Sequence, residues 1–161
     1  MTTAEYNQCV QEWADALYRF ACKSIGNQED AQDVVQQSFA TLWEKRTEVL
    51  PEKAKSYLFT IAYRRCMDVH RSRDKIKGTE HLPERTMAYR MPAHDLKSIL
   101  NKALATLDQQ SRTLVLLKDY EGYNYEEIAV ATGLNTTQVK VYLHRARKSL
   151  KQYLVSREHI I

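Results

Sequence analysis

The sequence predicts an all-α protein made of two small helical domains joined by a flexible linker. Apolar residues recur every three or four positions along most of the 161-residue chain, as they do on the buried face of a helix. Only 4 glycines and 3 prolines are present. The periodicity fails from Asp74 to about His94, where Gly78, Pro83 and Pro92 interrupt a charged stretch. We interpret residues 74–94 as the linker.

The first predicted helix spans roughly Ala4 to Ser24, and Gly26 follows its end. Its apolar stripe consists of Tyr6, Cys9, Val10, Trp13, Leu17, Phe20 and Ala21. The second helix spans roughly Gln28 to Arg46 and is capped by Asn27. Acidic residues near its N-terminus interact favourably with the helix dipole. Its inner face consists of Ala31, Val34, Val35, Phe39 and Leu42.

A third helix is predicted after Pro51, from roughly Glu52 to Arg73. Its inner face consists of Ala54, Leu58, Ile61, Ala62 and Val69. Three helices with short connections are expected to pack as one bundle. Residues 1–73 are therefore the first predicted domain.

The second predicted domain, residues 95–155, ends in two helices joined by a tight turn. Two helices are first expected over residues 95–107 and 108–121, and Gly122 ends the latter. Asn124 can then cap a short helix, with Glu127 as its capping-box partner, and Gly133 permits the turn. Asn135 and Gln138 form a second capping box before a long helix. The tail, residues 156–161, is expected to fray.

The long helix has an apolar face at Val139, Leu143, Ala146, Leu150 and Leu154 and basic residues elsewhere. A helix-turn-helix of this kind places its second helix in the DNA major groove, where the first turns contact base edges. The residues expected at base edges are Thr136, Thr137 and Lys140. Those expected at phosphates, which position the protein without reading sequence, are His144, Arg145, Arg147 and Lys148. The alternative is a solvated surface helix, but the paired caps and the glycine turn favour DNA binding.

Charge and composition narrow the class further. Residues 1–50 carry four Lys/Arg against eight Asp/Glu, whereas residues 51–90 carry ten against five and residues 91–161 carry ten against seven. An acidic front and a basic middle and rear indicate two kinds of partner, one of them polyanionic. The cysteines have neither zinc-ligand nor disulfide-framework spacing, so we expect no metal and no cofactor. The N-terminus lacks signal-peptide features, and no apolar run approaches 18 residues.

The third helix supplies a second cationic surface, with aromatic residues among its cations. Tyr57, Arg64 and Arg71 are seven residues apart and share a stripe. This combination favours opened DNA, because cations follow the backbone while rings stack on unpaired bases. The alternative is that Phe59 and one tyrosine are core residues. The expected surface comprises Lys53, Tyr57, Tyr63, Arg64, Arg65, His70, Arg71 and Arg73, with Phe59, Lys55, Lys75 and Lys77 nearby.

The second helix offers an acidic and amide face away from its apolar stripe. This face would repel DNA, so its expected partner is a protein, although a solvated face is an alternative. The expected contact residues are Asp30, Asp33, Gln36, Gln37 and Trp43.

These segments together resemble an extracytoplasmic-function sigma factor of bacterial RNA polymerase, a member of the sigma-70 superfamily. The segment GNQEDAQDVVQQSFATLW, residues 26–43, resembles the part of region two that docks on the β′ clamp helices. The segment SYLFTIAYRRCMDVHRSR, residues 56–73, resembles the helix that melts and reads the minus-ten element. Residues 107–150 resemble region four, which reads the minus-thirty-five element. The sequence departs from many relatives at Gln37 and Cys66.

The resemblance implies a promoter-specificity factor rather than an enzyme. Its implied partners are core RNA polymerase, through the β′ clamp helices and the β flap, promoter DNA and an anti-sigma factor, with no small-molecule substrate. It further implies capture of a flipped base by the loop at residues 47–53. The implied location is the cytoplasm, or the inner membrane when an anti-sigma factor holds the protein there.

Three other functions compete with this interpretation. A dimeric repressor would need a self-complementary apolar helix, and the sequence offers no obvious spare one. An enzyme would need catalytic groups, but no Ser/His/Asp set, phosphate loop or metal spacing is evident. A helical interaction module would lack the steep salt dependence that phosphate contacts impose.

Overall fold

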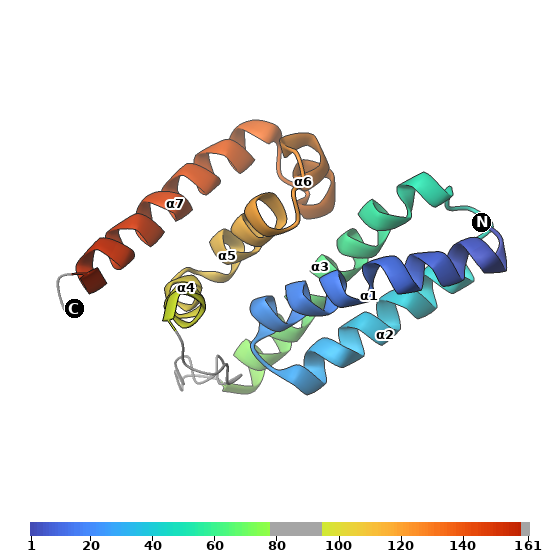
Figure 1. Cartoon of the computed structure of the whole chain (residues 1–161), viewed down its shortest axis with the longest axis horizontal. Helices are drawn as coiled ribbons and strands as arrows, with labels where there is room; N and C mark the ends of the chain where they lie inside the picture. Colours follow the sequence, from blue (N-terminus) through green and yellow to red (C-terminus); the bar gives the residue numbers. More distant parts are fainter. Residues whose placement is uncertain (78–94, 159–161) are drawn as a thin grey trace. The chain divides into compact units, whose positions relative to one another are not determined.

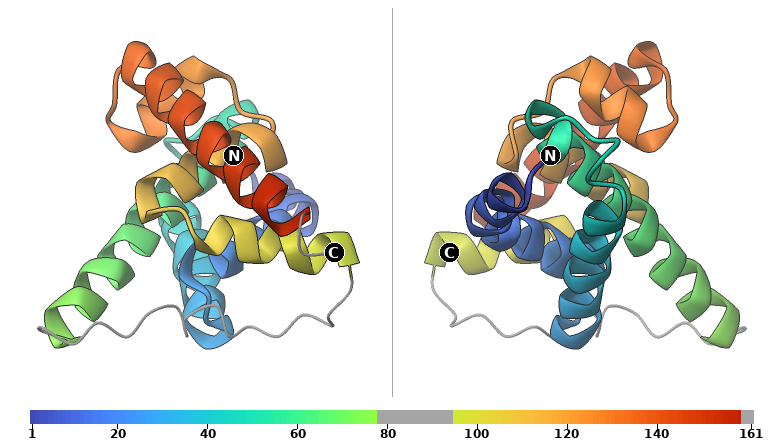
Figure 2. Two further views of the ribbon diagram at one scale, coloured as in Figure 1. Left: turned by 90° about the vertical axis from the view of Figure 1, so that its left-hand side faces the viewer. Right: turned by 90° about the vertical axis from the view of Figure 1, so that its right-hand side faces the viewer.

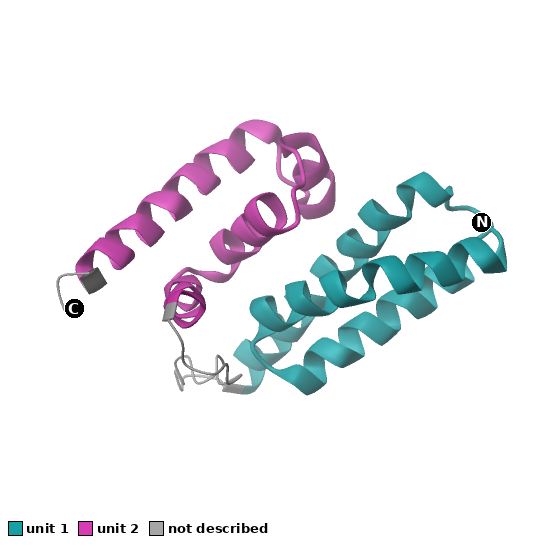
Figure 3. Ribbon diagram, in the orientation of Figure 1, with its two compact units in different colours: residues 1–83 teal, residues 84–161 magenta. Residues whose placement is uncertain are grey.

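The computed structural model describes residues 1–77 and 95–158, and every regular element in these ranges is helical. The chain divides into two compact units, residues 1–83 and 84–161 (Figure 3). The predicted all-α, two-part architecture is therefore confirmed. Each unit has a hydrophobic core of its own, described separately below.

Three long helices form unit 1 and lie side by side (Figures 1 and 2). They are α1 (Thr3–Ile25), α2 (Gln28–Glu44) and α3 (Ala54–Lys77), with a short 3₁₀ turn, η1 (Pro51–Lys53), before α3. Fully buried side chains from all three helices meet in the core, among them Leu17, Leu42 and Leu58. Phe20 of α1 meets Phe59 of α3 edge to face, with ring centroids 5.6 Å apart. Each such side chain contributes about 1.5–3 kcal/mol of burial free energy.

Local caps explain where the first two helices begin and end. Thr2 and Glu5 form a capping box at the start of α1 that the sequence analysis did not anticipate. Gly26 ends α1 in the left-handed region, with φ of 79°, where a side chain would be strained. Asn27 then caps α2 by accepting from the Asp30 amide at 2.9 Å. The two helices are thus joined by two residues and held antiparallel.

The structure corrects three details of the first domain. Helix α3 continues through Lys77, so the predicted linker began too early at Asp74; residues 74–77 contain no helix breaker, and Gly78 is the first. Helix α2 ends at Glu44, two residues before Arg46. Phe59 has no exposed surface and belongs to the core rather than to a stacking surface. The remainder of the predicted linker, residues 78–94, lies outside the described residues.

Unit 2 contains α4 (Asp95–Ala105), α5 (Gln109–Val115), a π-helical turn η3 (Leu116–Tyr120), α6 (Tyr125–Thr132) and α7 (Thr136–Glu158). Helix α7 packs on α4, α5 and α6. The core of unit 2 is filled by apolar side chains from α5, η3, α6, α7 and the connection between η3 and α6: Leu114, Leu116, Leu117, Tyr123, Ile128, Val139 and Leu143. The single helix predicted over residues 108–121 consists of α5 followed by the π-helical turn η3.

The turn between α6 and α7 has the predicted geometry. Asn124 and Glu127 exchange hydrogen bonds of 2.9 and 2.8 Å, and Asn135 and Gln138 exchange hydrogen bonds of 3.0 and 2.8 Å. Gly133 has φ of 81° and donates its amide to the Ala129 carbonyl at 2.9 Å. These contacts fix where α6 begins and ends and where α7 begins. Helix α7 extends to Glu158, beyond the fraying predicted from residue 156, and residues 159–161 lie outside the described part.

Candidate nucleic-acid interface

The outer side of α3 and the short turn η1 before it carry exposed cations. Lys53 and Arg64 are exposed, and Arg71 is exposed beside Asp68, with which it forms an ion pair of 2.6 Å. Both partners keep about 70% of their side-chain surface exposed (73% and 69%). Such a surface pair contributes roughly 0–1 kcal/mol, so a phosphate can readily replace Asp68 as the partner of Arg71.

Aromatic side chains accompany these cations. Tyr57, Tyr63 and His70 are half-buried along α3. Burial raises the pKa of the Tyr63 hydroxyl, with an opposing effect from Arg71, so this hydroxyl remains a neutral hydrogen-bond donor. Half-buried rings held by a helix are preorganised for stacking, because less side-chain entropy is lost on binding.

The other two arginines of α3 point into unit 1. Arg65 hydrogen-bonds the Gln37 side-chain oxygen and the Thr41 hydroxyl of α2, the latter at 3.2 Å. Arg73 donates to the Ile25 carbonyl at 2.7 Å and to the Asp30 carboxylate at 2.8 Å. The Arg73 side chain is 20% exposed, compared with 73% for Arg71. The arginines of α3 therefore divide into an outward pair, 64 and 71, and an inward pair, 65 and 73.

The acidic and amide face of α2 lies beside this inward pair. Asp33, Gln36 and Gln37 are exposed and Asp30 is half-buried. Gln37 donates to Asp33 at 2.8 Å while its oxygen receives Arg65. A cleft of about 370 Å³ lies between α2 and α3, and its polar lining consists of Asp30, Asp33, Gln37, Arg65, Asp68, Ser72 and Arg73. The α2 face and α3 are thus joined by side-chain hydrogen bonds.

Trp43 belongs to a different neighbourhood from the other predicted residues of α2. It lies 13 positions after Asp30, which places the two about 20 Å apart along the axis. Its indole is 37% exposed. The Tyr6 ring packs edge-on at 4.9 Å and the Arg46 guanidinium lies 3.7 Å above the indole. Trp43 therefore forms a braced aromatic surface next to the loop that leads to α3.

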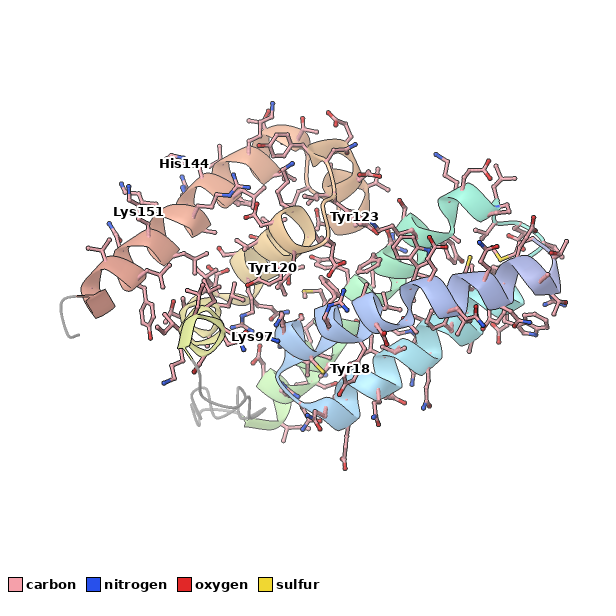
Figure 4. The ribbon with its side chains drawn as sticks, viewed as in Figure 1. Tyr18, Lys97, Tyr120, Tyr123, His144 and Lys151 are labelled. Atoms are coloured by element: carbon pink, nitrogen blue, oxygen red, sulfur yellow. The ribbon has the colours of Figure 1, made fainter. Side chains whose placement is uncertain are left out.

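The exposed face of α7 carries most of the residues predicted to contact DNA. Thr137, Lys140, His144, Arg145 and Lys148 are exposed and Thr136 is half-buried, whereas Val139, Leu143 and Ala146 are buried on the opposite side. Figure 4 shows His144 and Lys151 projecting from α7 on the side away from α5. The predicted division of α7 into an apolar inner face and a polar outer face matches these positions, except that Leu150 and Leu154 are only half-buried.

Arg147 differs from the other basic residues predicted to contact DNA because its guanidinium is bonded to a carboxylate of the same unit. Its guanidinium forms a two-point contact with Asp119 of η3, at 2.6 Å from Nη2 and 3.2 Å from Nε. The hydrogen bond with Asp119 is the main reason that the pKa of Arg147 is raised. Bidentate pairs of this kind fix orientation as well as adding attraction. Arg147 therefore connects α7 to η3.

A cluster around Tyr125 was missed by sequence reasoning. The ammonium groups of Lys118 and Lys140 lie 4.9 and 5.3 Å from the centroid of the Tyr125 ring, which opens α6. These residues come from three elements, η3, α6 and α7, so no spacing in the sequence connects them. Two ammonium groups beside a tyrosine ring can together bind a phosphate.

A groove on the opposite flank of α7 was also missed. It measures about 350 Å³, and its lining includes Asp108, Gln110 and Ser111 near the start of α5 and Tyr142, Arg145 and Ser149 on α7. Hydroxyl, amide and guanidinium donors converge there, with Asp108 as the one carboxylate of the lining. Donors of these types bind phosphate oxygens. The polar groups therefore flank α7 on both sides.

Neither a metal site nor a membrane span is present in these described ranges. Across residues 1–77 and 95–158, no group of three His, Cys, Asp or Glu residues is arranged to hold a metal ion. Within the part of the chain that the structure describes, no helix is long and apolar enough to span a bilayer. Cys9, Cys22 and Cys66 are buried and free, and burial raises the pKa of Cys66 to about 12, so it remains an unreactive thiol.

Comparison with known proteins identifies both units. Residues 9–76 match the family described as Sigma-70 region 2, and residues 97–150 match Sigma-70, region 4. The chain is 31% identical over 151 residues to RNA polymerase sigma factor SigV of Bacillus subtilis, covering 93% of this chain and 91% of that protein. It is 32% identical over 160 residues to ECF RNA polymerase sigma factor SigE of Mycolicibacterium smegmatis, covering 92% of this chain but only 61% of that protein.

Solved structures show the same fold. The sigma factor RpoE, solved with the anti-sigma factor NepR from Bartonella quintana, superposes with a TM-score of 0.75 at 24% identity, covering 92% of this chain and 96% of that one. CnrH, solved with the cytosolic domain of CnrY, superposes with a TM-score of 0.68 at 24% identity, covering 94% of this chain and 88% of that one.

Proposed function

The chain belongs to the extracytoplasmic-function sigma factors of the sigma-70 family, RNA polymerase subunits that direct promoter-specific transcription initiation, and we propose how its two units divide this work. Unit 1 binds core polymerase and the opened minus-ten element. Unit 2 binds the minus-thirty-five element as duplex. The observation that carries this division is the contrast between an aromatic, cationic α3 and a helix-turn-helix α7.

For polymerase, the proposed surface is the exposed acidic and amide part of α2. Asp33, Gln36 and Gln37 are its centre, and Asp30 borders it while paired with Arg73. The β′ clamp helices are the proposed partner. Trp43 lies at the opposite end of α2 from Asp30. We therefore propose that it contacts polymerase separately from the acidic and amide part of the helix. The β flap is the proposed partner of unit 2.

For the minus-ten element, the proposed surface is the outward part of α3 together with η1. Lys53, Arg64 and Arg71 supply charge, and Tyr57, Tyr63 and His70 supply rings and polar edges. Arg65 and Arg73 are given a positioning role instead, because their guanidinium groups are bonded to α2 and to the end of α1. Stacking of one unpaired base contributes about 1–3 kcal/mol, which helps to offset the cost of opening the duplex.

For the minus-thirty-five element, α7 is the proposed recognition helix. Thr136, Thr137 and Lys140 lie in its first turns, where base edges are reached. His144, Arg145 and Lys148 follow as phosphate contacts, with the Tyr125 cluster on one flank and the Arg145 groove on the other. Arg147 is proposed to orient α7 through Asp119.

Further parts of the proposal concern regulation and setting. Because RpoE and CnrH were solved with NepR and CnrY, a protein inhibitor of this chain is proposed as well. The proposed location is the cytoplasm, where polymerase acts, with catalysis supplied by polymerase and none by this chain. Residues 78–94, which follow the end of α3, are proposed to connect the region-two and region-four domains.

Reconstitution with purified bacterial core polymerase tests this function. We expect a stable complex with core and transcription from a defined set of start sites on genomic DNA, with core alone as the control. Asp33→Lys combined with Gln36→Lys should abolish the complex, whereas Glu12→Lys on the exposed side of α1 should not. Failure of the wild-type chain to bind core would contradict the proposal.

A further inference from the structure

One apolar side chain lies in the middle of the polar face of α7. Val141 is 40% exposed. It lies between the exposed Lys140 and the half-buried Tyr142. Successive residues of a helix are rotated by 100°, so Val141 lies on the side of α7 opposite the buried Val139 and Leu143. It therefore occupies the outermost part of α7 and has no place in the core.

The residues around Val141 are those of the proposed DNA surface. Thr137 precedes it by four positions, and His144 and Lys148 follow it by three and seven, so all four share one face. All four are exposed. Val141 lies within the first two turns of α7, the part of a recognition helix that reaches base edges.

The chemistry of an isopropyl group restricts what it can contact there. It offers no hydrogen-bond donor or acceptor, so the polar atoms of guanine, adenine and cytosine edges would lose water without compensation against it. The C5-methyl group of thymine is the one apolar group that a base pair of unmodified DNA presents in the major groove. An apolar side chain among hydrogen-bonding ones is thus complementary to a thymine among other bases.

We propose that Val141 is a specificity-determining residue that reads the C5-methyl group of a thymine in the minus-thirty-five element. This inference rests on the proposed role of α7 as recognition helix and adds the chemical identity of one base that it reads. Removing a buried methyl contact is expected to weaken binding on the order of threefold to tenfold.

Other exposed valines provide the comparison that isolates position from exposure. Val155 is 44% exposed on the same helix but lies 14 positions further along, and Val130 is 74% exposed on α6. Singly exposed apolar residues are common on protein surfaces. What distinguishes Val141 is its place in the first turns of α7 between Thr137 and His144.

The test uses the holoenzyme and a promoter duplex selected by it from a random-sequence library. Each thymine of the selected upstream element is replaced, one at a time, by deoxyuridine, which removes only the methyl group. With wild-type protein we expect one position at which binding falls threefold to tenfold. With Val141→Ala, binding to the thymine duplex should fall by a similar factor and the deoxyuridine effect should disappear. Val155→Ala and Val130→Ala should behave as wild type.

The possible results separate the inference from the function on which it rests. Selection of no upstream sequence would overturn both the assignment of α7 and this inference. Selection of an upstream element whose thymines all tolerate deoxyuridine would overturn the inference alone, and this result depends on no variant. A deoxyuridine effect that persists undiminished in Val141→Ala would also overturn it, because another group would then read the methyl.

Discussion

Helices α3 and α7 are of almost equal length, 24 and 23 residues, and both are rich in lysine and arginine, yet they use their cations differently. In α3, Arg65 and Arg73 bond to neighbouring helices while Arg64 and Arg71 face outward. In α7, Arg147 is bonded to Asp119, and several other cations are on the exposed face. The charge of a helix therefore does not give the number of cations that can meet DNA.

The aromatic residues differ in the same way. In α3 they range from fully buried Phe59 to half-buried Tyr57 and Tyr63, so the helix serves as a core element and a stacking surface at once. In unit 2, Tyr125 lies between two lysines at the start of α6. The two tyrosines of α7, Tyr142 and Tyr153, are half-buried on the flank next to its apolar face rather than on its outer face. This contrast is consistent with the proposal that unit 1 binds unpaired bases and unit 2 binds duplex DNA.

The largest expected effect concerns Phe59. Phe59→Ala removes a fully buried ring that packs on Phe20, so it should lower the free energy of unfolding by about 3–5 kcal/mol. Tyr57→Ala, on a half-buried ring of the same helix, should cost less stability but weaken binding to opened DNA. Chemical denaturation and binding of single-stranded minus-ten DNA measure the two effects. Equal stability of the two variants would contradict the core assignment of Phe59.

A second contrast separates the inward from the outward arginines. Arg73→Ala breaks hydrogen bonds to Ile25 and Asp30 in a partly buried setting, so a loss of about 1–2 kcal/mol in stability is expected. Arg71→Ala is the matched control, because its partner Asp68 is exposed and its stability should be almost unchanged. Thermal unfolding of both variants decides the point. A destabilised Arg71→Ala with an intact Arg73→Ala would reverse the assignment.

The third contrast applies the same division to α7. Arg145→Ala should reduce the salt slope of minus-thirty-five binding by about 1, as expected when one phosphate contact is lost. Arg147→Ala should leave that slope almost unchanged and instead lower affinity through the orientation of α7, because its guanidinium is bonded to Asp119. Asp119→Asn should resemble Arg147→Ala. Titrations at several salt concentrations measure the slopes, and a loss of slope in Arg147→Ala would show a direct phosphate contact.

The last expected effect appears only above pH 9 and is a dependence of stability on alkaline pH. The folded-state pKa of Cys66 is raised from 9.0 to about 12, so the unfolded chain releases this proton first. The contribution of this thiol to stability is therefore complete below pH 9 and is lost as pH rises towards 12. Cys66→Ala should flatten the fall in unfolding free energy between pH 9 and 12. An unchanged slope in this variant would contradict the buried thiol as a cause.

Much of the fold could be predicted from local signals. Capping boxes at Asn124 and Asn135, the left-handed Gly133 and the periodic apolar faces are each set by a few neighbouring residues, and the structure confirms them. The boundaries were less accurate. Helix α3 passes Asp74 because Lys75 and Lys77 have good helix propensity and no helix breaker precedes Gly78, and the π-turn η3 gives no pattern distinct from an α-helix.

The contacts within the candidate surfaces could not be predicted for a different reason. Arg64 and Arg65 are adjacent in the sequence, and only the packing of α2 against α3 places one outside and the other against Gln37. Lys118 and Tyr125 meet through the fold of η3 and α6. Which cations face solvent is thus a tertiary property. The roles predicted for the individual surface residues remain predictions that the variants above test.

The most direct test of two surfaces that bind different strand states is a crossed transcription assay with holoenzyme. The templates are a duplex promoter, the same promoter opened beforehand at the minus-ten element, and both forms without the upstream element. We predict that Arg64→Ala combined with Arg71→Ala loses transcription on the duplex and recovers on the opened template. Lys140→Ala should lose transcription only where the upstream element is present, whatever the state of the minus-ten strands. Equal losses of both variants on all four templates would contradict the division between α3 and α7.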